Sequence, residues 1–295
     1  MRKSEKKMVD LVVQKCFDLD DYRQNIGFSG DIFMIFGLPT QRLKGNPPYW
    51  TKKTSYCELT ITRNEKFEIP YGCYARMNQI FIDTEVKTKN TNLIDVGRSF
   101  REYTHKLGYK DGWANKSLLR QLVNYVTSVI TVIPAQEMQN RLVGIQSVIA
   151  EKWDITFDVQ SPDQLMLSKG QIILDPRYAK WIHDHSAPLN MDVVNVFRRN
   201  PLALDFYRYL AYRNNELSKP VSFLDCLLFE ELGTEQQNDR YTRSHLKRIL
   251  QVIQLYWPVR AKFEDGYFEL KPSPPAIQKR LPSQTPIKIV DEFRD

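Results

Sequence analysis

The stretch that decides the fold is SFLDCLLFEELGTEQQNDRYTRSHLKRILQVIQLYWPVRAKFEDGYFELK, which runs from Ser222 to Lys271. Ser222 is a favourable N-cap, and the apolar residues after it predict an amphipathic helix that ends at Leu232-Gly233. A second helix is predicted from Arg240 to Tyr256. An amphipathic helix, a short polar turn and a cationic helix follow one another in this order in a helix-turn-helix. The apolar residues expected inside are Leu224, Leu227, Leu228 and Leu232 in the first helix and Leu246, Ile249, Leu250 and Ile253 in the second.

The residues after the second helix predict a β-hairpin. Asp265-Gly266 favours a type I′ turn, and apolar and polar residues alternate on both sides of it. A helix-turn-helix followed directly by a hairpin predicts a winged helix. The stretch from Arg240 to Lys262 contains no acidic residue, whereas an ordinary surface helix mixes charges of both signs. Its cations are the predicted DNA contacts: Arg240, Arg243, Lys247, Arg248, Arg260 and Lys262.

The same order of elements occurs earlier in the chain. Ser99 is the expected N-cap of a helix that ends at Leu107-Gly108, and Asn115 is the expected N-cap of the helix that follows. The β segments at 129–134 and 155–159 are expected to form the wing of this unit. Two such units predict a protein that contacts duplex DNA in two places. The predicted DNA contacts, on one polar face at i, i+4 and i+8, are Lys116, Arg120 and Asn124.

The residues before these units are predicted to form an adaptor built on a β-hairpin, with strands at 31–39 and 55–62. The connection between the strands is basic and aromatic, and no acidic residue occurs between Ile32 and Cys57. Such a connection either follows DNA phosphates or is a solvated loop, and the sequence leaves both interpretations open. If it contacts DNA, the expected contacts are Arg42, Lys52 and Lys53.

The composition fits this organisation. A chain of 295 residues that is 42% hydrophobic and 26% charged can form one large core or two ordinary ones, and two is the commoner arrangement. The formal net charge of +7 favours a polyanionic partner such as double-stranded DNA. The expected fold class is α+β, with two winged-helix domains in tandem after a β-hairpin adaptor. The predicted boundaries are 1–68 for the adaptor, 69–187 and 188–272 for the domains, and 273–295 for a flexible tail.

Membrane, metal and cofactor roles are not predicted. No apolar stretch approaches the roughly 20 residues that span a bilayer, and the N-terminus has no signal-peptide core, so a cytoplasmic protein without membrane contact is expected. The four cysteines form no CxxC pair, and no histidine lies at ligand spacing beside them, so neither zinc nor disulfides are expected. No other cofactor is indicated.

An enzyme is not predicted either. The sequence has no GxxxxGK[ST] loop, so ATP hydrolysis is unsupported. His183-Asp184-His185 is superficially similar to the metal motif of nicking initiators, but Asp184 stands where that motif needs an apolar residue. A solvated loop before Pro188 is the preferred interpretation of this segment.

A family resemblance becomes specific in several of these stretches. They are IPYGCYARMNQIFIDTEVKTKNTNLIDVGRSFREYTHKLG (69–108), NPLALDFYRYLAYR (200–213), FEELG (229–233) and HLKRILQVIQLYWPVRAKFEDGYFELKPSPPAI (245–277). Together with the GLP motif at 37–39, they resemble the RepA-type plasmid replication initiators over residues 31–277.

This resemblance implies two winged-helix domains that bind repeated or inverted sites at a plasmid origin and help to open the duplex. It also implies recruitment of host initiation and helicase-loading proteins and repression of the protein's own gene. Initiators of this type commonly bind origin repeats as monomers and their promoter as dimers, so a homodimer is among the expected partners. The family has no covalent chemistry to transfer.

A tandem winged-helix transcriptional regulator, without a role in initiation, is the alternative, and a structural scaffold is a third class. In either DNA-binding class, the base edges are expected to be read by Arg120, Asn124, Arg243 and Lys247, while the other cations contact phosphates.

Overall fold

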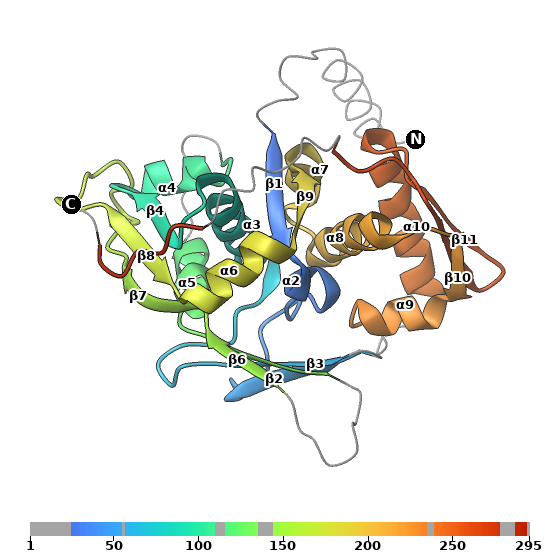
Figure 1. The fold of residues 1–295 in the computed structure, drawn as a ribbon, viewed down its shortest axis with the longest axis horizontal. Coiled ribbons are helices and arrows are strands. Elements are labelled where there is room, and N and C mark those ends of the chain that lie inside the picture. Colours follow the sequence, from blue (N-terminus) through green and yellow to red (C-terminus); the bar gives the residue numbers. More distant parts are fainter. Residues whose placement is uncertain are drawn as a thin grey trace.

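The computed structural model describes residues 25–54, 57–109, 116–134, 144–234, 239–277 and 287–293. These ranges form a mixed α and β structure whose sheets are small and antiparallel (Figure 1). The helices are α2 (Asp31–Ile35), α3 (Gly72–Lys89), α4 (Phe100–Lys106), α5 (Lys116–Val126), α6 (Pro176–His185), α7 (Met191–Phe197), α8 (Pro201–Glu216), α9 (Asp225–Glu231) and α10 (Asp239–Tyr256). No helix in these ranges is both long enough and apolar enough to cross a bilayer.

The strands pair in four groups. They are β1 (Ile26–Gly30), β2 (Tyr49–Lys53), β3 (Cys57–Thr62), β4 (Leu93–Gly97), β5 (Val129–Pro134), β6 (Ile145–Val148), β7 (Ala150–Asp154), β8 (Gly170–Leu174), β9 (Ser186–Asn190), β10 (Val221–Leu224), β11 (Arg260–Glu264) and β12 (Tyr267–Lys271). Their orders are β1-β9, β2-β3-β5-β6, β4-β8-β7 and β10-β12-β11. In Figure 1 the β1-β9 pair stands between two halves, with α3 to α6 on one side and α8 to α10 on the other.

In the second half, the predicted cationic helix and hairpin are confirmed. The four apolar residues predicted to lie inside α10 are all buried. Asp265 and Gly266 have φ of 48° and 83°, which are the left-handed values that a type I′ turn requires. This turn sets the register of β11 and β12, so that Phe263 faces Phe268 across the hairpin.

The start of the preceding helix differs from the prediction. Ser222 does not cap a helix, because Val221–Leu224 form β10, which pairs with β12, and α9 begins only at Asp225. The pairing turns Leu224 outward, and 47% of its surface is exposed. Leu227 lies on the exposed side of α9, and 46% of its surface is exposed. Leu228 and Leu232 are buried as predicted.

In the first half, Ser99 caps α4 as predicted, since its side chain accepts a hydrogen bond from Glu102 N. The helix ends before Gly108, whose φ is +74°. The segment 129–134 is a strand, but 155–159 is not. β5 pairs with β3 on one side and with β6 on the other, so the strand that takes the place expected for 155–159 is β6.

The N-terminal prediction is wrong in one strand. Asp31–Ile35 form the short helix α2 rather than a strand, and Ile32, Phe33 and Met34 on it are all buried. The hairpin consists of β2 and β3, so residues 49–53 are a strand and not part of a loop. It joins β5 through β3, which makes it part of a sheet of the first half.

A buried polar cluster connects the two halves. The guanidinium of Arg76 on α3 donates to both carboxylate oxygens of Asp205 on α8 and to the carbonyl oxygens of Leu38 and Pro39. Arg208 on α8 donates to Gln79 Oε1 at 2.6 Å. Both arginine side chains are fully buried, so these contacts hold α3 against α8, and loss of one partner would leave a buried charge without it.

Candidate nucleic-acid interface

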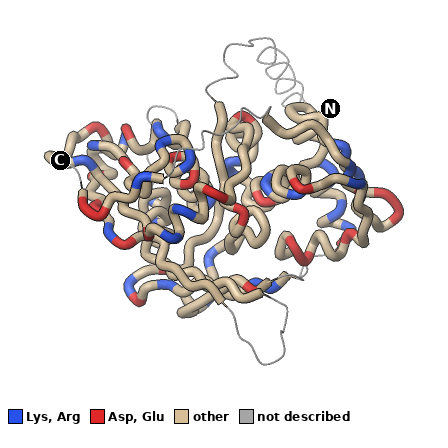
Figure 2. The backbone as a smooth tube through the Cα atoms, in the orientation of Figure 1, with Lys and Arg blue, Asp and Glu red and all other residues tan. Residues whose placement is uncertain are grey.

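The outer face of α10 carries the main basic surface of the described residues. Arg240, Ser244, Lys247 and Gln251 are spaced i, i+4, i+7 and i+11, and all four are exposed, as is Arg248 beside Lys247. No ion pair links Arg240, Lys247 or Arg248 to another described residue. In Figure 2 the positions of Lys and Arg follow α10 along this side of the molecule. We name these five residues the α10 face.

The opposite side of α10 fixes this orientation. Leu246, Ile249, Leu250 and Ile253 are buried, and Trp257 just beyond the helix donates its indole N–H to Pro274 O at 2.7 Å. Rotation of the helix to hide the α10 face would expose this apolar stripe to water, at a cost of roughly 1.5–3 kcal/mol for each large side chain. The cations are therefore held toward solvent by the core.

Arg243, by contrast, faces α9. Its guanidinium makes two hydrogen bonds to the carboxylate of Asp225, one of them 3.0 Å between Nη2 and Oδ1. Asp225 is 3% exposed, and the hydrogen bond to it raises the pKa of Arg243 above its usual value. The structure therefore gives Arg243 an internal partner, and base reading would require that pair to break. Its expected role in reading bases stays a prediction.

The hairpin contributes less positive charge than the sequence indicates. Lys262 pairs with Glu264 and, at 3.3 Å, with Glu269, and these hydrogen bonds raise the pKa of the ammonium group. The turn itself carries Glu264 and Asp265, which appear as the acidic tip of the hairpin in Figure 2. Arg260, at the other end of β11, is exposed. The hairpin is thus positively charged where β11 begins and negatively charged at its turn.

The first half presents a smaller basic surface on α5. Lys116 and Arg120 are exposed, and Arg120 lies 3.4 Å from the hydroxyl of Ser117. Asn124 is 1% exposed, because the connection between β3 and α3 crosses this part of the helix and Glu68 N donates to Asn124 Oδ1. The placement of Asn124 is a correction, since a buried amide with this partner supports the fold and reaches no base edge. Asn115, the predicted N-cap, lies outside the described residues.

The three cations of the N-terminal connection have three different environments. Arg42 is exposed and pairs with Glu68, and Lys53 is exposed and pairs with Glu58. Lys52 instead points inward, where its ammonium group donates to Phe36 O and Glu231 O, each at 2.7 Å. Lys52 therefore joins β2 to the ends of α2 and α9, which is a structural role. Only Arg42 and Lys53 remain available at the surface.

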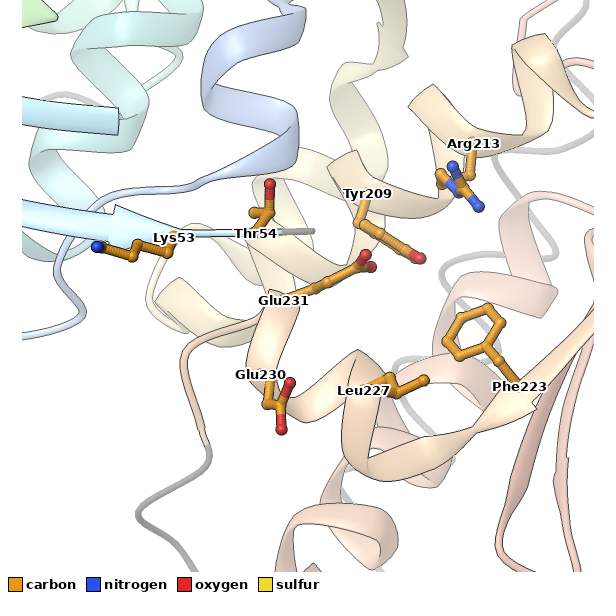
Figure 3. Close-up of a pocket in the computed structure, with 8 residues that line it drawn as sticks. All are labelled: Lys53, Thr54, Tyr209, Arg213, Phe223, Leu227, Glu230 and Glu231. Carbon is orange, nitrogen blue, oxygen red and sulfur yellow. The ribbon is translucent and has the colours of Figure 1, made fainter. Parts of the chain in front are cut away.

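A cleft of about 460 Å³ lies beside Lys53, between the end of β2 and the elements α8, α9 and β10. Figure 3 shows Glu231 directed toward Tyr209, with Glu230 and Leu227 along α9 and Arg213 on the far wall. Its lining mixes cations with two carboxylates, so a polyanion would meet repulsion as well as attraction there. The cleft is thus a poorer surface for DNA than the α10 face.

Two residues of the α10 face, Ser244 and Gln251, were not predicted from the sequence. Their spacing from Arg240 and Lys247 places them on the same side of the helix. The sequence identifies this side as the exposed one only when the buried side of the helix is known. Gln251 matters chemically, because a glutamine amide can make two hydrogen bonds to adenine.

The histidine segment is also placed differently from the prediction. His183 and His185 lie in the last turn of α6, not in a loop, and His183 contacts Asp184 and Asn90. In the ranges that the structure describes, no group of three or more His, Cys, Asp or Glu has the arrangement of a metal site.

Comparison with known proteins gives one family and one fold. The family model described as plasmid-encoded RepA protein matches residues 69–222, which is more than half of the chain. Two crystal structures of domains 2 and 3 of RctB, one of them of selenomethionine derivatives, have similar folds. Their TM-scores are 0.53 and 0.52 at 11% and 12% identity, and the alignments cover 82% of this chain and 96% and 97% of theirs. No curated protein matches the sequence.

Proposed function

The chain belongs to the plasmid-encoded RepA protein family, and from that premise we propose that it initiates plasmid replication by binding repeated sites at the origin. The observation that carries the proposal is the α10 face, where Arg240, Lys247 and Arg248 project from a helix whose other side is fixed in the core. Exposed cations along one helix are suited to contact phosphates and base edges in a major groove.

We further propose that both halves are winged-helix units. In the second, α9 and α10 would form the helix-turn-helix and β11-β12 the wing; in the first, these elements would be α4, α5 and the β5-β6 hairpin. The repeated order supports the assignment. The fold similarity to domains 2 and 3 of RctB is consistent with it.

The structure favours an unequal division of contacts between the two units. On α10, Gln251 and Arg248 are the proposed base-reading residues, while Arg240 and Lys247 contact phosphates. On α5, the proposed contacts are limited to Lys116 and Arg120. The second unit would therefore provide most of the sequence preference, and the first unit most of the added affinity on longer sites. Arg260, Arg42 and Lys53 are proposed as peripheral phosphate contacts.

Opening of the duplex, recruitment of host replication proteins and repression of its own gene are further parts of the proposal, supported by family membership. A cytoplasmic location and a dimeric form on the promoter belong to it as well. None of these steps requires a catalytic group or a cofactor in this chain. A transcriptional regulator with the same DNA-binding units remains the second candidate, because the α10 face would serve both roles.

The test is footprinting of the full chain on the DNA that flanks its own gene, over a salt series and with random duplex as competitor. Protection of several direct repeats of about two helical turns each, followed by unpaired bases in an adjacent segment, would support an initiator. Protection of a single inverted site at the promoter, without unpaired bases, would support the regulator. Absence of any sequence preference at every salt concentration would contradict both.

A further inference from the structure

The end of the chain returns to the first half of the molecule. Where the sequence predicts a flexible tail, residues 287–293 lie in extended form along the turn between α3 and β4. Lys288 N donates to Asn90 O at 2.7 Å, and Lys288 forms a parallel bridge with Thr91. In Figure 1 this segment lies near β7 and β8, on the opposite side of the molecule from the β10-β12-β11 sheet that precedes the tail.

A buried asparagine recognises the backbone of this segment. Asn92 Oδ1 accepts a hydrogen bond from Val290 N at 2.7 Å, and its Nδ2 donates to Val290 O at 3.0 Å. The same Nδ2 donates to Leu174 O, and the Asn92 side chain has no exposed surface. A buried amide without these partners would cost about 1–3 kcal/mol for each unsatisfied group, so the site is complete only when an extended chain fills it.

The other contacts to the segment involve mainly its backbone and depend little on its side chains. Lys152 on β7 donates to Asp291 O at 2.8 Å, and Ile287 packs against the core, whereas Lys288 and Ile289 are exposed. Backbone hydrogen bonds together with an apolar side-chain contact are a usual way in which a protein binds an extended peptide.

A second asparagine uses the same geometry at the start of the tail. Asn214 on α8 accepts from Ser273 N at 3.0 Å and donates to Ser273 O at 3.1 Å, and Trp257 donates to Pro274 O. The tail is therefore attached at both ends, at 273–274 on the second half and at 287–291 on the first half.

We propose that the groove formed by Asn90, Thr91, Asn92 and Lys152 is a binding site for an extended peptide, and that residues 287–291 are its resident ligand, bound within the same chain. The site takes a short extended segment with an apolar residue at its first position, and it binds the backbone of the residue three positions further on. When the tail leaves, a peptide of this pattern can bind from solution.

The test uses the full chain with Val290→Pro, which removes the N–H that Asn92 accepts. A fluorescent peptide of residues 285–293 is added, and its anisotropy is measured. Because an attached tail acts at a local concentration in the millimolar range, the wild-type chain should bind the peptide at least tenfold more weakly than the Val290→Pro chain. Ile289→Ala, at an exposed position, is the matched control and should behave as the wild type does.

Hydrogen exchange gives a second measurement on the same proteins. The amide of Lys288 should be protected in the wild type and in Ile289→Ala, and should lose protection in Val290→Pro. Failure of the peptide to bind Val290→Pro at millimolar concentration, or an unprotected Lys288 amide in the wild type, would overturn the proposal. A wild-type dimer that becomes monomeric with Val290→Pro would overturn binding within one chain, because the tail would then be exchanged between copies.

Discussion

Arg243 on α10 holds the buried carboxylate of Asp225 on α9 through two hydrogen bonds, and it thereby joins the two helices of the proposed helix-turn-helix. The pair sits at the edge of the α10 face, where the sequence indicates only an unpaired cation. Its geometry implies that Arg243 acts on DNA binding through the position of α10.

Arg243→Ala should lower the free energy of unfolding by about 1–3 kcal/mol, because Asp225 keeps its burial and loses its partner. DNA affinity should fall equally on all sequences, and the base preference should persist. Urea unfolding and a binding-site selection on the same variant measure the two effects. Arg248→Ala, which has no such partner, is the control for stability, and its unfolding free energy should stay within about 0.5 kcal/mol of the wild type. A relaxed preference at one base position in Arg243→Ala would contradict this assignment.

The α10 face should determine the salt dependence of binding. Each of Arg240→Gln and Lys247→Gln should reduce the slope of log K against log salt by about 0.9, because one phosphate contact and its released counterion are lost. Gln251→Ala should leave that slope unchanged and should relax the preference at one base pair, at a cost of about 1–3 kcal/mol on the cognate site. Fluorescence anisotropy over a salt series measures both, on cognate and random duplexes. If Gln251→Ala reduces the slope instead, the division between phosphate and base contacts is wrong.

How far the sequence predicts this molecule depends on whether the decisive partner is local. The turn at Asp265-Gly266, the cap at Ser99 and the apolar stripe of α10 depend on neighbours in the chain, and all three were predicted. Ser222, by contrast, is predicted to be a helix cap and lies in a strand. The strand depends on pairing with Glu269 in β12, which is far away in the sequence.

The same reason explains the errors at the candidate site. Asn124 has the right helical spacing for an exposed face, but the segment at Glu68 covers it, and no local pattern reports a crossing chain. Lys52 and Lys53 are adjacent and chemically identical, yet alternation along a strand sends one inward and one outward. Burial of Arg76 and Arg208 was likewise not predicted, since each requires partners from distant segments.

Asp83, which accepts a hydrogen bond from Gln79 in the buried cluster between the halves, predicts a dependence of stability on pH. Burial raises the pKa of Asp83 on α3 from 3.8 to about 7, although Gly30 N donates to its carboxylate. The folded state then binds this proton more tightly than the unfolded state does. The contribution of Asp83 to the free energy of unfolding is therefore largest below about pH 4. It falls as the pH rises toward 7 and is constant above that.

Asp83→Asn removes this titration and keeps an oxygen that can accept from Gly30 N. Between pH 4 and pH 8, the free energy of unfolding should decline less for Asp83→Asn than for the wild type. The difference in unfolding free energy between the two proteins should therefore favour the variant most above pH 7. Asp265→Asn at the exposed hairpin turn should retain the wild-type profile. Parallel profiles for Asp83→Asn and the wild type would show that Asp83 is ionised throughout this range.

The ion pair between Arg76 and Asp205 should be the strongest single connection between α3 and α8. Arg76→Met should destabilise the chain by about 3–5 kcal/mol, because the buried carboxylate of Asp205 loses both hydrogen bonds from Arg76 and keeps only the 3.5 Å contact with Arg208. Adding Asp205→Leu to it should recover part of that loss, which a double-mutant cycle measures in thermal or urea unfolding. Additive effects of the two changes would mean that the residues stabilise the chain independently of each other.

Lys52 and Lys53 provide the sharpest separation of structural from DNA-binding cations, since they are neighbours on one strand. Lys52→Met should cost about 1–3 kcal/mol of stability, because the carbonyl oxygens of Phe36 and Glu231 lose their donor, and the salt slope of DNA binding should not change. Lys53→Met should leave stability unchanged, since its exposed pair with Glu58 contributes little. If β2 contacts DNA, Lys53→Met should reduce the salt slope by about 0.9, whereas an unchanged slope in both variants would place β2 outside the interface.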